Sequence, residues 1–168
     1  MLRLLTLGGL DLRDAHGEAH PLLAQPKRLG LLVFLAMAGN GGVRRRDILL
    51  SHFWPELDET RARGALRQAT YVLRRSLGDR VIVMRGDDEL GIDVSELWTD
   101  VTAFESAVNA GDMHAAAGLY RGDFLDGFFV SGASSAFDEW VSLERQRLRR
   151  LAAQSRAPAG AGAAQPSA

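Results

Sequence analysis

Arginine side chains recur in residues 58–78 at spacings that place them on one side of a helix. The guanidinium group is a planar fork of donors that fits phosphate oxygens and the guanine edge in the DNA major groove. Apolar residues occupy the other side of the helical wheel, so this stretch predicts a helix that packs through one face and presents the other to DNA. The apolar face consists of Ala62, Leu66, Ala69, Leu73 and Leu77. The exposed face consists of Thr60, Arg61, Gly64, Arg67, Gln68, Tyr71, Arg74 and Arg75.

The residues of the exposed face suit different contacts. Arg67 and Gln68 could reach base edges, and Tyr71 could contact a sugar or a phosphate. Gly64 would let the helix approach DNA closely, at a cost of about 1 kcal/mol of helix stability relative to alanine. A solvated basic face without a ligand is the alternative, and the helix alone does not decide between them. Phosphate contacts are expected from Arg61, Arg74 and Arg75.

A second basic cluster, Arg44, Arg45 and Arg46, stands at the expected start of another helix. Positive side chains there oppose the helix dipole. A phosphate bound at this helix end would relieve the opposition, since helix N-termini favour anions. A solvated charge cluster is equally compatible with the sequence.

The sequence before and after residues 58–78 predicts the helices and strands that must position the arginines. Asp58 or Thr60 can cap the start of that helix and Gly78 can end it. Two helices are expected before it and a β-hairpin after it, which is the order of a winged helix–turn–helix. The expected helices are 26–38 and 45–53, the second with Ile48, Leu49 and Phe53 or Trp54 inward. The hairpin is 81–85 with 90–94, and strands at 2–7, 10–12 and 19–23 form a small antiparallel sheet.

The sequence changes character after residue 97. Amphipathic patterns predict helices over 100–110, 113–120 and 137–154, separated by an aromatic, glycine-rich loop over 123–135. The segment 155–168 consists mainly of alanine, glycine and proline, and we expect it to be disordered. The expected organisation is therefore residues 1–96, residues 97–154 and a tail, 155–168.

Composition narrows the function classes. The 168 residues carry a net charge of −1, so basic residues are concentrated locally and the whole chain is not a generic polyanion binder. There is no cysteine, and no apolar run is long enough to span a bilayer, which favours a cytoplasmic protein without a membrane partner. The four histidines are scattered and residues 39–42 lack the lysine of a phosphate loop. We expect no enzyme activity, no cofactor and no metal.

Residues 53–55 and 67–78 resemble the DNA-binding domain of the Streptomyces antibiotic regulatory proteins (SARP), a winged helix of the OmpR/PhoB type. Residues 117–128 and 137–145 are similar to the start of the bacterial transcriptional activator domain, a TPR-like helical module. The resemblance covers residues 2–154 and implies a mostly α fold with small antiparallel β: a winged helix–turn–helix followed by a short helical module. Two features depart from the family: the module stops after about one repeat, and Arg44–Arg46 replace the usual capping and acidic residues.

The resemblance also implies a function. It indicates a sequence-specific DNA-binding transcriptional regulator, an activator, with double-stranded DNA and RNA polymerase as partners and a homodimer on direct repeats. In the family the wing touches the minor groove or the backbone. Here the acidic turn 86–89 leaves only Arg85 as a wing contact.

The aromatic loop is the candidate for a second function. Phe124, Phe128 and Phe129 could contact a partner protomer or RNA polymerase, since clustered exposed aromatics mark interfaces. The interpretation that we favour from the sequence is that they plug the space between the helical module and the winged helix. The alternatives for the whole chain are a protein-interaction module that uses the winged helix as a scaffold, and a fragment of a larger multidomain regulator.

Overall fold

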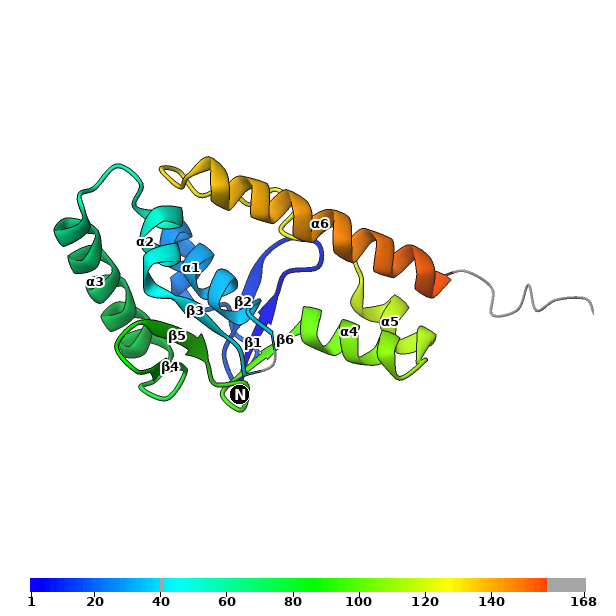
Figure 1. Ribbon diagram of the computed structural model, residues 1–168. Coiled ribbons are helices and arrows are strands. Elements are labelled where there is room, and N and C mark those ends of the chain that lie inside the picture. Colours follow the sequence, from blue (N-terminus) through cyan, green and yellow to red (C-terminus); the bar gives the residue numbers. More distant parts are fainter. Residues whose placement is uncertain (40, 157–168) are drawn as a thin grey trace, which may run out of the picture.

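The computed structural model describes residues 1–39 and 41–156. Helices dominate, and two three-stranded sheets lie between them (Figure 1). In chain order the elements are β1 (Leu2–Leu5), β2 (Asp11–Arg13), the 3-10 helix η1 (Pro21–Ala24), α1 (Pro26–Ala36), β3 (Val43–Arg45), α2 (Arg46–Phe53), α3 (Glu59–Leu77), β4 (Ile82–Arg85), β5 (Glu89–Ile92), β6 (Leu97–Thr99), α4 (Asp100–Asn109), α5 (Met113–Leu119) and α6 (Ser135–Arg156).

Helix α1 is the centre of the winged helix. Its residues 29–35 are all buried, because the apolar side chains cover nearly the whole circumference. Helices α2 and α3, η1 and strand β5 pack around it. The hairpin β4–β5 follows α3 directly, so the expected winged helix–turn–helix is confirmed, with a short helical region after it (Figure 1).

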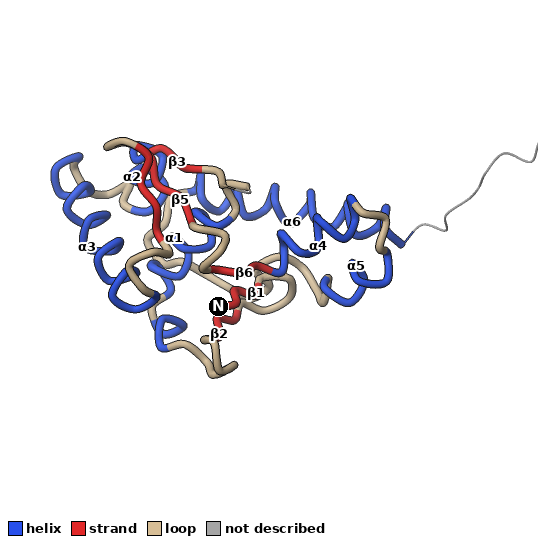
Figure 2. Tube along the Cα trace, turned by 90° about the horizontal axis from the view of Figure 1, so that it is seen from below, coloured by secondary structure: helices blue, strands red, loops and turns tan. Residues whose placement is uncertain are grey.

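The two sheets are small and hold different parts of the chain. The sheet β3-β5-β4 is antiparallel throughout and forms the wing. The other sheet has the order β2-β1-β6, with β1 antiparallel to β2 and parallel to β6. Strands β3 and β6 were not expected from the sequence. Figure 2 shows β6 beside β1, although β1 ends at Leu5 and β6 begins only at Leu97.

Two local expectations are wrong. Residues 19–23 do not form a third strand: Ala19 makes only an isolated bridge to Arg13, and Pro21 then begins η1. The Nδ1 atom of His20 accepts a hydrogen bond from the Leu22 amide at 3.1 Å, which caps this turn of helix. Ile48 does not point inward but is 39% exposed, whereas Leu49 is fully buried as expected.

A buried carboxylate joins the sheet to the helical region. Asp100, 1% exposed, begins α4 directly after β6. Its oxygens accept hydrogen bonds from the amides of Thr6 and Leu7 and from the Thr6 hydroxyl, at 2.8–3.0 Å. These donors lie just beyond the end of β1, so one side chain fixes the first strand against the start of α4.

Helix α6 lies across the winged helix and the α4–α5 pair (Figures 1 and 2). Its Phe137 ring lies 4.9 Å from Phe53, and its Trp140 ring lies 4.8 Å from Phe34. At its other end α6 packs on α5. Contacts thus cross the expected boundary at residue 96, and the division into residues 1–96 and 97–154 stays a prediction. Ser155 and Arg156 of the expected tail are helical, and residues 157–168 lie outside the described residues.

Candidate nucleic-acid interface

Local signals in the sequence define both ends of α3. The Asp58 carboxylate accepts a hydrogen bond from the Arg61 amide at 2.9 Å, which caps the first turn. Gly78 follows the last residue with a φ of 108°, a conformation that favours glycine. Four residues of the apolar face predicted from the helical wheel are buried, with Ala62, Leu66, Ala69 and Leu73 at most 4% exposed, and the fifth, Leu77, is half-buried at the helix end.

The opposite face of α3 is open to solvent. Tyr71 is 58% exposed, and a Cβ added at Gly64 would meet no atom within 4 Å. The structure thus brings six of the predicted DNA-contacting residues onto one exposed helix face, although their contact with DNA stays a prediction. This exposed α3 face comprises Arg61, Gly64, Arg67, Gln68, Tyr71 and Arg75.

Arg74 belongs to the flank of α3, beside the wing. It is half-buried, and its Nη2 lies 3.5 Å from the carbonyl oxygen of Ile82 in β4. Its Nε is buried without a hydrogen-bond partner among the described residues. Arg74 therefore reaches towards the hairpin, which distinguishes it from the exposed Arg75.

The basic cluster 44–46 divides between core and surface. Arg44 lies in β3, where its Nε donates to the Phe34 carbonyl at 2.9 Å and its guanidinium lies 4.0 Å above the Phe34 ring. Burial lowers the pKa of Arg44, and the negative charge of Glu144 opposes that shift. Arg45 is exposed and pairs with Asp47 at 3.1 Å. Arg45 is the N-cap of α2 and Arg46 is its first residue, so these two arginines do stand at a helix start as expected. Arg44 does not join them on the surface, because its side chain turns from β3 towards Phe34.

The wing carries its own ion pair. Arg85 at the end of β4 pairs with Glu89 at the start of β5, and this hydrogen bond raises the pKa of Arg85. The turn between them, residues 86–88, is exposed and contains two aspartates. An Arg85 side chain held by Glu89 is partly neutralised, so the wing offers less to a phosphate than α3 does.

Two cations that the sequence reasoning missed lie on the other flank of α3. Lys27 and Arg28 at the start of α1 share a surface groove of about 420 Å³ with Gln68 of α3 and with Trp54. The Lys27 Nζ lies 5.3 Å from the centroid of the Trp54 ring. The signal in the sequence was the pair of basic residues after Pro26, but only the packing of α1 beside α3 shows that they adjoin the exposed α3 face.

The three phenylalanines of the aromatic loop have different environments. Phe124 is fully buried, with its ring 5.9 Å from Trp140, so it does not lie on a contact surface and that prediction is wrong for Phe124. Phe128 is half-buried against the core. Phe129 is 84% exposed and remains available to a partner.

The described part of the chain also bears on metal sites and membrane spans. There, no three His, Asp or Glu side chains lie close enough together to hold a metal ion. None of the helices in this part is both long enough and apolar enough to cross a membrane.

Comparison with known proteins shows a likeness in fold to a solved structure. No protein-family model matches the sequence, and no curated protein matches it. The solved structure of Mycobacterium tuberculosis EmbR, in complex with a low-affinity phosphopeptide, superimposes with a TM-score of 0.68 over 92% of this chain at 21% sequence identity. The two share a fold. The chain spans 43% of the EmbR chain, so the likeness concerns the architecture of that part.

Proposed function

We propose that this protein is a sequence-specific DNA-binding transcriptional regulator that places α3 in the major groove. The observation that carries the proposal is the exposed α3 face. Its arginines, glutamine and tyrosine are solvent-accessible while the opposite face of the same helix is buried in a winged-helix core. The fold shared with EmbR supports the same reading.

The exposed α3 face divides into two kinds of contact. Arg67 and Gln68, in the middle of the helix, are placed to read base edges. Arg61 and Arg75 each lie about two turns away from them, in opposite directions along the helix, and suit phosphates on either side of the groove. Lys27 shares a groove with Gln68 and would extend the phosphate-contacting surface beyond α3. Its Nζ lies 3.9 Å from the exposed Glu56 carboxylate, a distance at which the pairing is weak.

The helical region would serve protein contacts. As an activator, the protein would recruit RNA polymerase and bind direct repeats as a homodimer. The exposed Phe129 on the loop before α6 is the apolar side chain best placed for either contact, since it is 84% exposed. Both partners rest on the family resemblance of the sequence.

Salt-titrated binding tests the DNA contact. The full chain is titrated with promoter fragments selected from the source genome, and the slope of log affinity against log salt is measured. Arg75→Ala should reduce the slope by about one phosphate contact. Arg150→Ala is the matched control, because it removes the same charge from an exposed position on α6.

The rival function is a protein-interaction module in which the winged helix is only a scaffold. The exposed Phe129 favours it, since an exposed aromatic suits a protein interface. No binding to any genomic fragment at low salt would refute the DNA proposal and leave the interaction module. An equal loss of slope in both arginine variants would show a charge effect without a defined α3 interface.

A further inference from the structure

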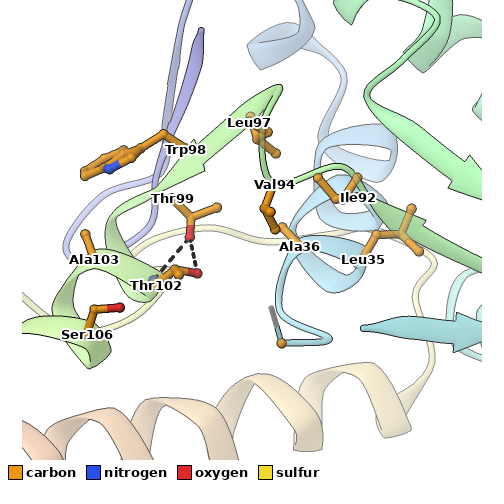
Figure 3. Close-up of a pocket in the computed structure, with 11 residues that line it drawn as sticks. Leu35, Ala36, Ile92, Val94, Leu97, Trp98, Thr99, Thr102, Ala103 and Ser106 are labelled. Atoms are coloured by element: carbon orange, nitrogen blue, oxygen red, sulfur yellow. Dashed lines mark hydrogen bonds between the residues drawn. The ribbon is translucent and has the colours of Figure 1, made fainter. Parts of the chain in front are cut away.

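A pocket separate from the exposed α3 face lies where the winged helix meets the helical region. It is a cavity of about 250 Å³, open to solvent on one side, between the end of α1, strand β5, strand β6 and α4. Figure 3 shows side chains of α4 on one side of the space facing side chains of α1 and β5 on the other. Its place at this junction sets it apart from the groove beside Gln68.

The walls of the pocket differ in chemistry. Leu35, Ala36, Ile92 and Val94 form an apolar wall (Figure 3). The facing wall carries hydroxyl groups, which cluster at the start of α4 and along its first two turns. These hydroxyls belong to Thr99, Thr102 and Ser106.

The hydroxyl wall retains hydrogen-bonding capacity. The Thr99 hydroxyl donates to the Thr102 hydroxyl at 2.8 Å, which uses the Thr99 hydrogen within the wall. Two hydroxyls that share one hydrogen bond use one of their two hydrogens, so the other hydrogen of this pair can donate to a ligand. Ser106 lies one turn further along α4 on the same side of the pocket (Figure 3).

Charge is absent from the lining. None of the described residues around the pocket is acidic or basic. The nearby Asp100 points the other way, since both of its oxygens accept hydrogen bonds from residues 6 and 7. The Arg3 guanidinium lies 4.5 Å from the centroid of the Trp98 ring, but Arg3 is not among the lining residues. A phosphate, carboxylate or ammonium group would therefore enter without an opposite charge on the lining itself, at a large desolvation cost.

We propose that this pocket binds a small uncharged molecule with a compact apolar body and one hydrogen-bonding group directed at the α4 hydroxyls. The volume lies just below the range typical of drug-sized ligands, about 300–1,000 Å³, so one or two rings would fill it. A ligand there touches α1 and α4 together. It therefore stabilises the joined arrangement of the winged helix and the helical region by mass action.

The test compares a neutral probe with a charged one of the same ring size. The full chain is titrated with 2-naphthol, which is neutral at about pH 7, and with 2-naphthoate, which is an anion there. Binding is followed by calorimetry and by amide chemical shifts in two-dimensional NMR. We expect saturable binding of 2-naphthol, shifts concentrated at residues 35–36, 92–94 and 99–106, and at least tenfold weaker binding of 2-naphthoate.

Variants place the binding in the pocket. Ala103→Phe, on the pocket side of α4, fills the space and should abolish 2-naphthol binding. Ala117→Phe adds the same ring at an exposed position of α5 and should leave binding unchanged. If circular dichroism shows that Ala103→Phe is unfolded, Ser106→Phe, at an exposed lining position, replaces it.

Three results would overturn the proposal. They are an absence of saturable 2-naphthol binding at millimolar concentration, equal binding of the anion, and undiminished binding by a folded pocket-filling variant. The DNA titration described above is independent of all three. Its failure would leave the pocket proposal standing, and the reverse also holds.

Discussion

The arginines of this protein differ in the surroundings of their guanidinium groups. Arg67 and Arg75 extend from α3 into solvent. Arg74, on the same helix, reaches the carbonyl of Ile82, and Arg44 lies over the Phe34 ring. Substitutions at these positions should therefore separate DNA contact from folding.

Arg67→Ala should weaken binding to the selected operator more than binding to unrelated DNA. A bidentate contact to a base edge discriminates by about 1–3 kcal/mol, and this discrimination is lost with the side chain. The measurement is the affinity ratio between operator and scrambled fragments at one salt concentration. An unchanged ratio with lower affinity for both would assign Arg67 to phosphate.

His52 gives a pH dependence to stability. Its ring stacks on Phe34 at 5.0 Å, and its carbonyl accepts a hydrogen bond from the Ser134 amide at 2.9 Å. Burial lowers the pKa of His52 below its ordinary value of 6.5, and the charge of Arg44 acts in the same direction. The unfolded chain therefore binds the proton first, and stability falls as the pH drops below 6.5 until the folded pKa is reached.

Thermal unfolding at about pH 7.5 and about pH 5.5 checks this effect. The melting temperature of the parent protein should be lower at the lower pH than at the higher pH. The His52→Gln variant should show a smaller decrease, because residue 52 no longer titrates. Equal falls in both proteins would mean that His52 does not contribute. The comparison stays above the range in which the carboxylates titrate.

At the scale of elements, α6 depends on an aromatic cluster for its position. Phe137 is 2% exposed and its ring contacts those of Phe34, Phe53 and Trp140. Gly30 of α1 contributes by its small size, since a Cβ there would lie 2.8 Å from a Val130 methyl group. The segment before α6 thus packs directly against the backbone of α1.

Phe137→Ala should lower the free energy of unfolding by about 3–5 kcal/mol, because it leaves a cavity among the aromatic rings. Urea denaturation measures the change. Leu143→Ala is the control on the same helix: this side chain is 64% exposed, and its loss should cost no more than about 0.5 kcal/mol. Similar losses in both variants would contradict the role of the cluster.

Predictability from sequence also differs between elements. Helix α3 was predicted with its cap, its end and its buried face, because these signals are local. Strands β3 and β6 have three residues each, and β6 pairs with β1 from the other end of the winged helix, so no local pattern indicates them.

The candidate site shows the same limit. The exposed α3 face followed from the helical wheel. The inward position of Arg44 did not, since a run of three arginines does not indicate which one will stack on a distant ring. Lys27 was missed because Gln68, with which it shares a groove, is far from it in the sequence.

At the scale of the whole molecule, Asp100 connects the N-terminal sheet to the helical region. Its carboxylate satisfies the amides that follow β1 while its backbone begins α4. Arg121, after α5, places its Nη2 3.7 Å from the same carboxylate. Loss of this side chain should therefore affect sheet and helical region together.

Asp100→Ala should lower the free energy of unfolding by about 3 kcal/mol, because buried donors at residues 6 and 7 lose their acceptor. Asp112→Ala is the matched control. Asp112 caps α5 by accepting from the Ala115 amide at 3.0 Å at an exposed position, and its loss should cost about 1 kcal/mol. Chemical denaturation followed by fluorescence and by circular dichroism gives both values, and a cost at Asp100 no larger than at Asp112 would contradict the connection.

Helix α6 has a geometric consequence for any assembly on DNA. It comprises 22 residues, about 33 Å of helix, with the aromatic cluster near its start and Arg156 over the Tyr120 ring at its end. If two copies contact one another through α6, the packing of this helix on the winged helix would hold their α3 helices at a fixed distance and rotational phase. Such a pair would bind only operators in which the spacing of the two repeats matches this distance and phase. Inserting about five base pairs, half a helical turn, between the repeats would place one α3 on the wrong side of the duplex.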